Sequence, residues 1–425
     1  MSACPRAEND GPYRVAYLVS HPIQYQAPML RYLARRRELD LTVFFLSDLS
    51  VRGYRDQGFG VAVKWDVPLL EGYRNVFLPS LGRRDRVTFL EPLVVGIRNA
   101  LQAGHFDALW VHGYAHQAML RAVAAAKSLG LPVLLRGESN LLGPAPRALR
   151  GPLRRHLLPR LFRRIDGFLA IGSGNRAFYR AYGVPEERIF LMPYAVDNEF
   201  FASRAAEARR SRESLRVELG LEAARPIILY AAKFLRRKRP ADLLEAYRRL
   251  SPNGRDEPRP YLLYIGEGEE RSRLEGVAQR IGWSSIRFLG FKNQTELPRY
   301  YDLADVFALP SDYEPWGLVV NEVMNAATPV IVTDRVGAAL DLVEEGESGF
   351  VVPAGDVASL ADRLRRLTES PELARRVGGA GCRRISQWNF EADARGLLGC
   401  LRSVVPRAGG PRRSAPGPAS AQVAP

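Results

Sequence analysis

Residues 311–322 read Ser311-Asp312-Tyr313-Glu314-Pro315-Trp316-Gly317-Leu318-Val319-Val320-Asn321-Glu322. The apolar run before them, residues 305–310, ends in a proline and has the pattern of a buried strand. After Gly317 the apolar positions recur at intervals of three and four, which predicts a helix. Glu314 therefore belongs to a strand-to-helix loop, and Glu322 lies about two turns into the helix.

This loop combines two kinds of binding group. The start of a helix leaves backbone N–H groups unpaired, and these can bind a phosphate. Carboxylates would repel the phosphate, but they accept strong hydrogen bonds from the hydroxyl groups of a sugar. The alternative is a surface loop in which Glu322 is a solvated helix residue. The strand before the loop and the Pro-Trp-Gly-Leu turn inside it favour a binding site.

The pattern Ser-x-x-Glu-Pro-x-Gly-x-x-x-x-Glu resembles the E-x7-E signature of family 4 of the retaining glycosyltransferases, also called group 1, which have the GT-B fold. The resemblance implies that Glu314 contacts the transferred sugar and that Glu322 contacts the ribose of a nucleotide-sugar donor. It also implies that the turn after the first glutamate binds the donor diphosphate through Trp316, Gly317, Leu318 and Val319. The resemblance covers nearly all of the second half of the chain and the first half more loosely.

Two lysines in the second half fit the same family pattern. A predicted strand at residues 226–233 ends at Lys233, and Lys238 follows five residues later. Relatives typically have an arginine and a lysine at these positions, so the resemblance implies that both residues bind the donor diphosphate. Lysine at the first position lacks the two-pronged geometry of arginine. By the same resemblance, Gly290 and Phe291, at the end of another predicted strand, contact the nucleobase.

Candidate residues in the first half follow predicted strands, because open α/β sheets bind ligands at the carboxyl ends of their strands. In the first loop, His21, Gln24 and Tyr25 are candidates for contacts with the acceptor or the donor, where family members often have a Gly-Gly pair. The strand predicted at residues 106–112 ends at His112, and His116 follows it. For each of these residues the alternative is a packing or capping role.

A further predicted strand, residues 131–135, leads to Arg136 and Glu138. Many relatives have a histidine close to the reacting sugar here, so these residues depart from the family pattern. An arginine can bind a phosphate, and a carboxylate can hold or deprotonate the hydroxyl group of an acceptor. We predict a role in the site for this loop without assigning a catalytic base. The predicted catalytic residues are Glu314, Lys238, Lys233, Arg136, Glu138 and His112.

The chain has 425 residues, a hydrophobic fraction of 46% and a formal net charge of +15. Its length predicts two domains. The positive charge is nearly all arginine, which either reflects base composition or favours anionic partners such as nucleotides and lipid headgroups. The arginines are spread over the helices rather than interleaved with aromatic residues on one face, so no nucleic-acid partner is expected.

Neither the start of the chain nor any apolar run has the pattern of a signal peptide or a membrane span, so we expect a cytoplasmic protein. Residues 147–164 predict an amphipathic helix with a cationic face. This helix either packs on the sheet or rests on the anionic inner face of the cell membrane, and both alternatives are kept. The three cysteines, Cys4, Cys382 and Cys400, lack metal-type spacing, which argues against a zinc site. No metal ion or cofactor is expected, because the lysines and the helix dipole supply the positive charge.

Strands alternate with helices through both halves, which predicts an α/β fold with two doubly wound, Rossmann-like domains. The resemblance implies that these domains face each other across a cleft, as in GT-B proteins. We expect an acceptor domain at residues 12–197 and a donor domain at residues 198–388, with a last helix at about 389–402 that crosses back to the first domain. Residues 1–11 and 406–425 are expected to be a disordered leader and tail.

The resemblance implies a retaining glycosyltransferase that moves a sugar from a nucleotide-diphosphate sugar to a hydroxyl acceptor. By family habit the acceptor is a glycan, a lipid-linked sugar or an intermediate of a surface polysaccharide. The alternative is a catalytically silent GT-B subunit or carbohydrate-binding partner. It is favoured by the departures at Gln24-Tyr25, at Arg136 and at Tyr194, where family members usually read Pro-Asn-Gly-Val-Asp over residues 193–197. Loss of both lysines or of the two glutamates would support this alternative, and neither is lost.

Overall fold

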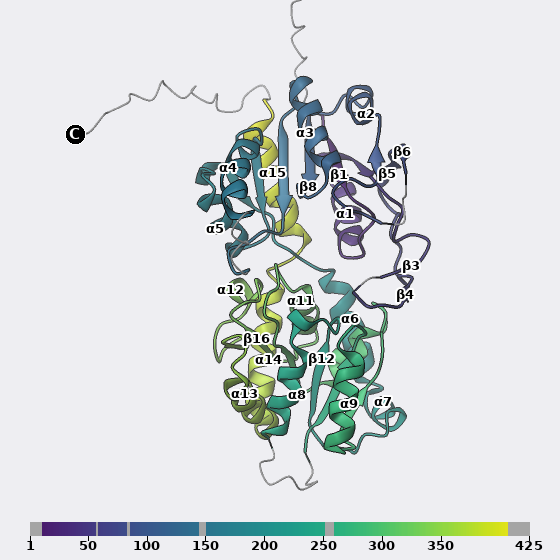
Figure 1. The fold of residues 1–425 in the computed structure, drawn as a ribbon, viewed down its shortest axis with the longest axis vertical. Coiled ribbons are helices and arrows are strands. Elements are labelled where there is room, and N and C mark those ends of the chain that lie inside the picture. The colour runs from purple at the N-terminus through teal and green to yellow at the C-terminus, as the bar shows by residue number, and fades with distance from the viewer. Residues whose placement is uncertain (1–10, 57, 83–85, 144–149, 251–258, 407–425) are drawn as a thin grey trace, which may run out of the picture.

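The computed structural model describes residues 11–406, apart from residue 57 and the segments 83–85, 144–149 and 251–258. Two α/β domains lie one above the other in Figure 1, and each is built on its own parallel sheet. The predicted α/β fold with two doubly wound sheets is thus confirmed. The predicted leader and tail lie outside the described residues, except for residues 11 and 406.

The first sheet has seven parallel strands. Their order across the sheet is β11 (Ile189–Leu191), β10 (Gly167–Ala170), β9 (Val133–Gly137), β8 (Ala108–His112), β1 (Tyr13–Val19), β2 (Leu39–Phe45) and β5 (Arg74–Phe77). One face is covered by α2 (Ile97–Ala103), α3 (Gln117–Ser128), α4 (Arg150–Phe162) and α5 (Ser173–Ala181), and α1 (Gln26–Ala34) lies on the other. The strand order reverses beside β1, which is where open α/β sheets bind ligands.

Two short antiparallel hairpins interrupt the first domain between β2 and α2. They consist of β3 (Tyr54–Arg55) with β4 (Ala62–Val63), and of β6 (Ser80–Leu81) with β7 (Leu93–Val94). The first hairpin hangs toward the second domain in Figure 1. It therefore belongs to the surface that faces the cleft.

The second sheet has six parallel strands. Their order is β14 (Ile286–Phe288), β13 (Tyr261–Ile265), β12 (Ile227–Ala231), β15 (Val306–Leu309), β16 (Val330–Thr333) and β17 (Phe350–Val352). All five residues of β12 are buried, as expected for a central strand that is covered on both faces. Its helices are α6 (Asn198–Arg209), α7 (Arg212–Glu218), α8 (Pro240–Arg248), α9 (Arg271–Ile281), α10 (Leu297–Leu303), α11 (Leu318–Asn325), α12 (Ala339–Leu342), α13 (Val357–Glu369) and α14 (Pro371–Ile385). Two 3-10 turns complete the domains, η1 (Glu186–Arg188) and η2 (Arg236–Lys238).

The last helix, α15 (Phe390–Val404), returns to the first domain and packs against β10, β11 and α1. Leu397 and Leu401 are fully buried in the core of that domain. The contact is close, because a Cβ on Gly396 would lie 2.0 Å from the carbonyl oxygen of Leu191. The chain therefore crosses between the domains twice.

A buried ion pair fixes α15 to the first sheet. Arg136 in β9 donates to the Oδ1 atom of Asp393 in α15 at 3.1 Å, and the two side chains are 1% and 0% exposed. The same guanidinium group also donates to the carbonyl oxygens of Met192 and Pro193. Burial raises the pKa of Asp393 to about 7, and the charge of Arg136 opposes this rise. The arginine thus connects the sheet, the end of β11 and the crossing helix.

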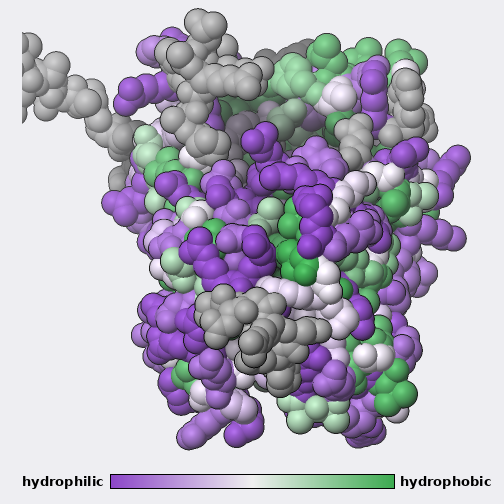
Figure 2. All heavy atoms as spheres, turned by 60° about the horizontal axis from the view of Figure 1, so that its bottom comes forward, coloured by the Kyte–Doolittle hydropathy of each residue, from purple (hydrophilic) through white to green (hydrophobic). Residues whose placement is uncertain are grey.

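Helix α4 lies within the predicted amphipathic segment 147–164, of which residues 147–149 fall outside the described part. Leu158 and Phe162 are buried in the core of the first domain, whereas Arg155 and Arg160 are exposed. One face of the helix therefore packs on the sheet and leaves cationic side chains in solvent. None of the helices in the described ranges is both long and apolar enough to cross a membrane. On the face shown in Figure 2, hydrophilic side chains cover most of the surface, and hydrophobic ones gather in small areas between them.

Asp393→Ala is expected to lower the free energy of unfolding by about 3 kcal/mol, because it leaves the Arg136 guanidinium group buried without its counter-charge. Urea denaturation followed by circular dichroism measures this change. Glu245→Ala is the matched control, since Glu245 pairs with Arg248 and the two side chains are 42% and 51% exposed. Its loss is expected to stay below about 1 kcal/mol. Equal losses in the two variants would contradict a special role for the buried pair.

Candidate active site

A cleft of about 590 Å³ lies between the two domains, at the carboxyl ends of both sheets. It brings together most of the residues that the sequence predicts for the site. These lining residues are His21, Gln24, Tyr25, Glu138, Lys233, Lys238, Phe291, Glu314, Trp316, Gly317, Leu318, Val319 and Glu322. The cleft is therefore formed jointly by the first loop of one domain and the strand-to-helix loops of the other.

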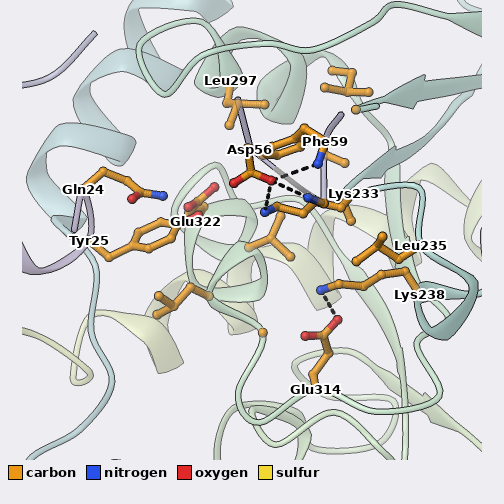
Figure 3. Close-up of a pocket in the computed structure, with 18 of the residues that line it drawn as sticks. Gln24, Tyr25, Asp56, Phe59, Lys233, Leu235, Lys238, Leu297, Glu314 and Glu322 are labelled. Atoms are coloured by element: carbon orange, nitrogen blue, oxygen red, sulfur yellow. Dashed lines mark hydrogen bonds and ion pairs between the residues drawn. The ribbon is translucent and has the colours of Figure 1, made fainter. Parts of the chain in front are cut away.

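Glu314 lies in the loop between β15 and α11, and several contacts hold its carboxylate. Its backbone N–H donates to the carbonyl oxygen of Arg335 at 3.0 Å, and the hydroxyl group of Ser311 donates to Oε1 at 2.9 Å. The ammonium group of Lys238 forms an ion pair with the same carboxylate (Figure 3). Glu314 is 5% exposed, so its charge depends on these partners.

The two predicted lysines both point into the cleft, and each contacts a carboxylate. Lys238, at the end of η2, pairs with Glu314, and Lys233, after β12, lies 2.7 Å from Oδ1 of Asp56. Burial lowers the pKa of Lys238, and the charge of Glu314 opposes this change. Two ammonium groups on one wall suit a ligand that carries at least two negative charges.

The start of α11 adds a third positive element. Gly317, the residue before the helix, has a φ of +101°, a conformation that glycine adopts readily, and no side chain caps this end. Gly317, Leu318 and Val319 line the cleft, so the N–H groups of Leu318 and Val319 can bind an anion. The N–H group of Val320 donates to the carbonyl oxygen of Gly317 at 2.9 Å. Trp316 also borders the cleft, but it is only 3% exposed and stacks on Trp388 with ring centroids 5.6 Å apart.

Glu322 lies deep in the cleft and is 2% exposed. The hydroxyl group of Tyr301 donates to its Oε2 atom at 2.5 Å, and Tyr25 points toward it from the first domain (Figure 3). Burial raises the pKa of Glu322 to about 7, and the nearby hydroxyl groups of Tyr301 and Tyr25 oppose this rise. Its Oε1 atom has no hydrogen-bond partner among the described residues, so it can accept a hydrogen bond from a ligand hydroxyl group.

A second hollow, of about 550 Å³, adjoins the cleft and shares Glu138 and Pro315 with it. Glu138 accepts a hydrogen bond from the hydroxyl group of Tyr194 at 2.7 Å, and Nε2 of His112 lies 3.6 Å from its Oε1 atom. Burial raises the pKa of Glu138, but the neighbouring His112 and the hydrogen bond from Tyr194 outweigh this effect and lower the pKa below its ordinary value. Glu138 is therefore a charged hydrogen-bond acceptor between the two cavities.

His21 stands at the rim of the main cleft, next to these groups. Burial lowers the pKa of His21 to about 4, and repulsion from His112 adds to the effect. The imidazole is therefore neutral at neutral pH, and the hydroxyl group of Ser20 lies 2.9 Å from its Nδ1 atom. In the part of the chain that the structure describes, no group of three or more His, Cys, Asp or Glu side chains could hold a metal ion.

Four predicted site residues do not line the main cleft, and His112 among them borders the second hollow. Arg136 does not line the cleft, which corrects its prediction as a phosphate ligand: β9 runs to Gly137, two residues beyond the predicted strand end, and the side chain turns into the core toward Asp393. His116 borders the second hollow, but its Nδ1 atom accepts from the N–H of Ala118 at 3.0 Å and caps α3. Gly290 turns the chain after β14 with a φ of +71° and lies behind the cleft wall that Phe291 forms.

A strip of the first domain also lines the cleft, and no pattern in the sequence indicates it. The strip comes from the β3–β4 hairpin and the residues after it, and its members are Tyr54, Asp56, Gly58, Phe59 and Trp65. The surrounding sequence mixes glycine and aromatic residues without a helical or strand period. No local signal indicates that such a segment contacts a domain more than a hundred residues away.

Glu322→Gln is expected to make the stability of the protein less dependent on pH. In the folded state the pKa of Glu322 is about 7, above its ordinary value of 4.5. The stability that this group contributes is therefore complete below the unfolded pKa and is lost as the pH rises through the folded pKa. Between about pH 5 and pH 8 the loss amounts to about 2 kcal/mol in the wild type, and a glutamine does not titrate.

Urea unfolding at both pH values tests this expectation. Asp393, whose pKa is also raised, contributes equally to the wild type and to the variant. Glu245→Gln, at an exposed glutamate, serves as control and should keep the pH dependence of the wild type. The same dependence in Glu322→Gln would show that this carboxyl group ionises at its ordinary pKa.

The comparisons with known proteins match both domains. A family model described as a glycosyl transferase 4-like domain matches residues 22–195, and one described as glycosyl transferases group 1 matches residues 211–384. The alpha-D-kanosaminyltransferase of Streptomyces kanamyceticus is 29% identical over 223 residues, which cover 52% of this chain and 56% of that protein. A D-inositol 3-phosphate glycosyltransferase of Corynebacterium urealyticum is 31% identical over 228 residues, 52% of this chain and 53% of that protein. The chain thus spans about half the length of these curated relatives.

The structural comparison extends over nearly the whole chain. The Anabaena protein HepE, solved in complex with UDP and glucose, has a TM-score of 0.67 at 18% sequence identity, and the match covers 92% of this chain and 100% of that chain. At this identity the likeness shows the fold. Together with the two family models, it shows that the chain belongs to the group 1 glycosyltransferases with the GT-B fold.

Proposed function

We propose that the protein is a retaining glycosyltransferase, which moves a sugar from a nucleoside-diphosphate sugar to a hydroxyl group of an acceptor. The observation that supports this most is the meeting of two lysines, the start of α11 and two buried glutamates in one cleft. The positive groups suit a diphosphate, and the carboxylates suit the hydroxyl groups of a sugar and a ribose. The names of the matched relatives, which are glycosyltransferases, support the same activity.

On the donor side, each group has a role that follows from its place. Lys233, Lys238 and the N–H groups of α11 bind the diphosphate, Glu314 holds the hydroxyl groups of the transferred sugar, and Glu322 holds the ribose. Phe291 forms the wall against which the nucleobase lies. The lysines and the helix start supply the positive charge, so the proposed reaction requires no metal ion.

In the proposed reaction, the bond between the anomeric carbon and the diphosphate oxygen breaks, and the same carbon forms a bond with the acceptor oxygen. The electron pair of the broken bond stays on the diphosphate, whose growing charge is stabilised by Lys233, Lys238 and the helix start. The acceptor proton moves to the departing diphosphate oxygen. Retention is proposed because the chain carries the glutamate pattern of the retaining family, and it requires the acceptor to approach from the side on which the diphosphate leaves.

The second hollow is the proposed acceptor site. Glu138 lies between the hollow and the donor cleft, with Tyr194 and His112 holding its carboxylate. Its lowered pKa makes it a weak base, so its proposed role is to orient the acceptor hydroxyl group rather than to remove the proton. We propose a glycan, a glycolipid or an intermediate of a surface polysaccharide as acceptor. For a lipid-linked acceptor, the exposed arginines of α4 suit an anionic membrane surface on the cytoplasmic side.

A catalytically silent subunit is the other function that the sequence leaves open. Two of the departures that favour it have partners unrelated to donor binding, since Arg136 pairs with Asp393 and Tyr194 donates to Glu138. The remaining departure, Gln24-Tyr25, places a tyrosine beside Glu322. These contacts leave the donor-binding groups intact, which favours an active enzyme.

A thermal-shift panel of UDP-, GDP- and ADP-linked sugars, in the presence of EDTA, tests the donor site. At a hundred times its dissociation constant, the right donor should stabilise the wild type by about 2.7 kcal/mol. Lys238→Ala should abolish the shift because it removes an ammonium group from the proposed diphosphate site. Lys127→Ala is the matched control, since Lys127 pairs with Asp166 on the first domain and does not line the cleft. A shift that survives in Lys238→Ala would contradict the proposed diphosphate site.

Glu138→Gln is expected to separate acceptor use from donor binding. The variant should keep the thermal shift with the donor that stabilises the wild type, because Glu138 does not take part in diphosphate binding. Transfer of the sugar should slow by about tenfold or more, since the amide orients an acceptor hydroxyl group less strongly than a carboxylate does. The measurement is nucleotide release in the presence of a panel of lipid-linked and soluble glycan acceptors. Unchanged turnover would exclude Glu138 from the acceptor site.

A further inference from the structure

The β3–β4 hairpin of the first domain reaches across the cleft and contacts the second domain. The side-chain amide of Asn293 donates to the carbonyl oxygen of Lys64 at 2.7 Å, and Asp66 accepts hydrogen bonds from the backbone and the hydroxyl group of Thr295. Trp65, between these two residues, lies with its ring centroid 6.4 Å from that of Phe291. The segment after the hairpin, residues 64–66, is thus anchored beside the proposed nucleobase wall.

At the tip of the hairpin, Asp56 is held in one orientation. Its Oδ1 atom accepts hydrogen bonds from the backbone N–H groups of Gly58 at 2.8 Å and Phe59 at 2.9 Å, and the hydroxyl group of Tyr54 donates to Oδ2 at 3.2 Å. Burial raises the pKa of Asp56, but the hydrogen bonds from Lys233, Phe59 and Gly58 outweigh it and lower the pKa below its ordinary value. Asp56 is therefore a fixed negative charge that points into the cleft (Figure 3).

This charge is directed at Lys233 of the other domain. Oδ1 of Asp56 lies 2.7 Å from the ammonium nitrogen, and Phe59 covers the same nitrogen with its ring centroid at 4.5 Å. Gly58 packs so closely on the lysine that a Cβ there would lie 2.7 Å from Lys233 Cδ. Phe59 in turn packs edge-on against Phe291 at 5.0 Å. The hairpin thus surrounds the lysine that is proposed to bind the donor.

We propose that Asp56 is a positioning residue that holds Lys233 in place of the donor diphosphate and gives up this contact when the diphosphate binds. The inference rests on the proposed function, in which Lys233 binds that diphosphate. A phosphate oxygen on the same ammonium group would lie close to the carboxylate of Asp56, and the two negative charges repel each other. The contact between Lys233 and Asp56 therefore weakens as the diphosphate binds. The diphosphate carries more negative charge than one carboxylate and also contacts Lys238 and the start of α11. It therefore displaces Asp56 from Lys233.

Two consequences follow for the reaction. Binding of the donor is weakened by the free energy needed to separate Lys233 from Asp56, because only the separated state is ready to bind. After transfer, the return of Lys233 to Asp56 competes with the nucleoside diphosphate and promotes its release. Because the two partners come from different domains, the exchange also loosens the hairpin from the second domain.

Inorganic pyrophosphate is a suitable probe, since it needs no knowledge of the nucleobase. Its affinity is measured by isothermal titration calorimetry without divalent metal for the wild type, Asp56→Asn, Lys233→Met and the double variant. We expect Asp56→Asn to bind pyrophosphate about three- to tenfold more tightly than the wild type. In the Lys233→Met background, Asp56→Asn should not change the affinity for pyrophosphate. The ammonium group for which Asp56 and pyrophosphate compete is then missing.

Asp66→Asn is the matched control, because Asp66 also joins the hairpin region to the second domain but contacts Thr295 rather than a lysine. It should leave the affinity for pyrophosphate unchanged. General damage to the hairpin would weaken binding, so the direction of the change separates the proposed exchange from a structural effect. Equal or weaker binding in Asp56→Asn, with pyrophosphate bound by the wild type, would overturn the inference and leave the donor site standing. If pyrophosphate binds to none of the four proteins, both the proposed exchange and the proposed donor site are overturned.

Discussion

The ion pair between Lys238 and Glu314 is the contact on which the cleft depends. Both side chains are largely buried, at 14% and 6% exposure, so each charge would be costly without the other. The pair connects η2 to the loop between β15 and α11, and this loop sets where the helix begins. Arg237 of the same turn supports this connection, since its guanidinium group donates to the carbonyl oxygen of Tyr313 and lies 3.7 Å from the carboxylate of Glu314. These contacts together fix the position of a cation, a carboxylate and the start of α11. A diphosphate in the cleft adds a second partner for the lysine without requiring the carboxylate to move.

The orientation of the two sheets explains why Lys238, Glu314 and the start of α11 face the first domain. Each sheet is parallel and points the carboxyl ends of its strands at the other, so the loops with free side chains face one another. The crossing helix α15 carries the chain back and is held by the buried pair of Arg136 and Asp393. A buried salt bridge contributes little net stability, but the loss of one partner is expensive. Its effect is to keep the position of α15 on the first sheet well defined.

The site residues of the second domain could be predicted more fully than those of the first. In the second domain the informative patterns lie within short stretches of sequence, whereas in the first they depend on contacts between distant residues. Lys233 and Glu314 lie in loops shortly after strands, and Lys238 and Glu322 follow them at fixed short distances along the chain. The family resemblance rests on this local pattern, and it implies that all four residues contact the donor. Arg136 follows the same rule by position, but its role depends on Asp393, 257 residues away, which no local pattern reveals. Asp56 was missed for the same reason, because its partner Lys233 is 177 residues away in the other domain. Long-range pairing of charges was the information that the sequence pattern lacked.

The two ion pairs of the cleft differ in a way that matters for its chemistry. Lys238 and Glu314 belong to the same domain, so their geometry stays constant however the domains move. Lys233 and Asp56 belong to different domains, so their contact exists only while the domains and the hairpin keep this arrangement. A ligand that binds to Lys238 and Glu314 finds these two side chains already in position. A ligand that binds Lys233 must break the contact of this lysine with Asp56 in the other domain. Part of its binding free energy therefore changes how firmly the two domains hold together. The cleft therefore combines a rigid half, suited to stabilising charge in the reaction, with a half in which binding and domain contact are coupled.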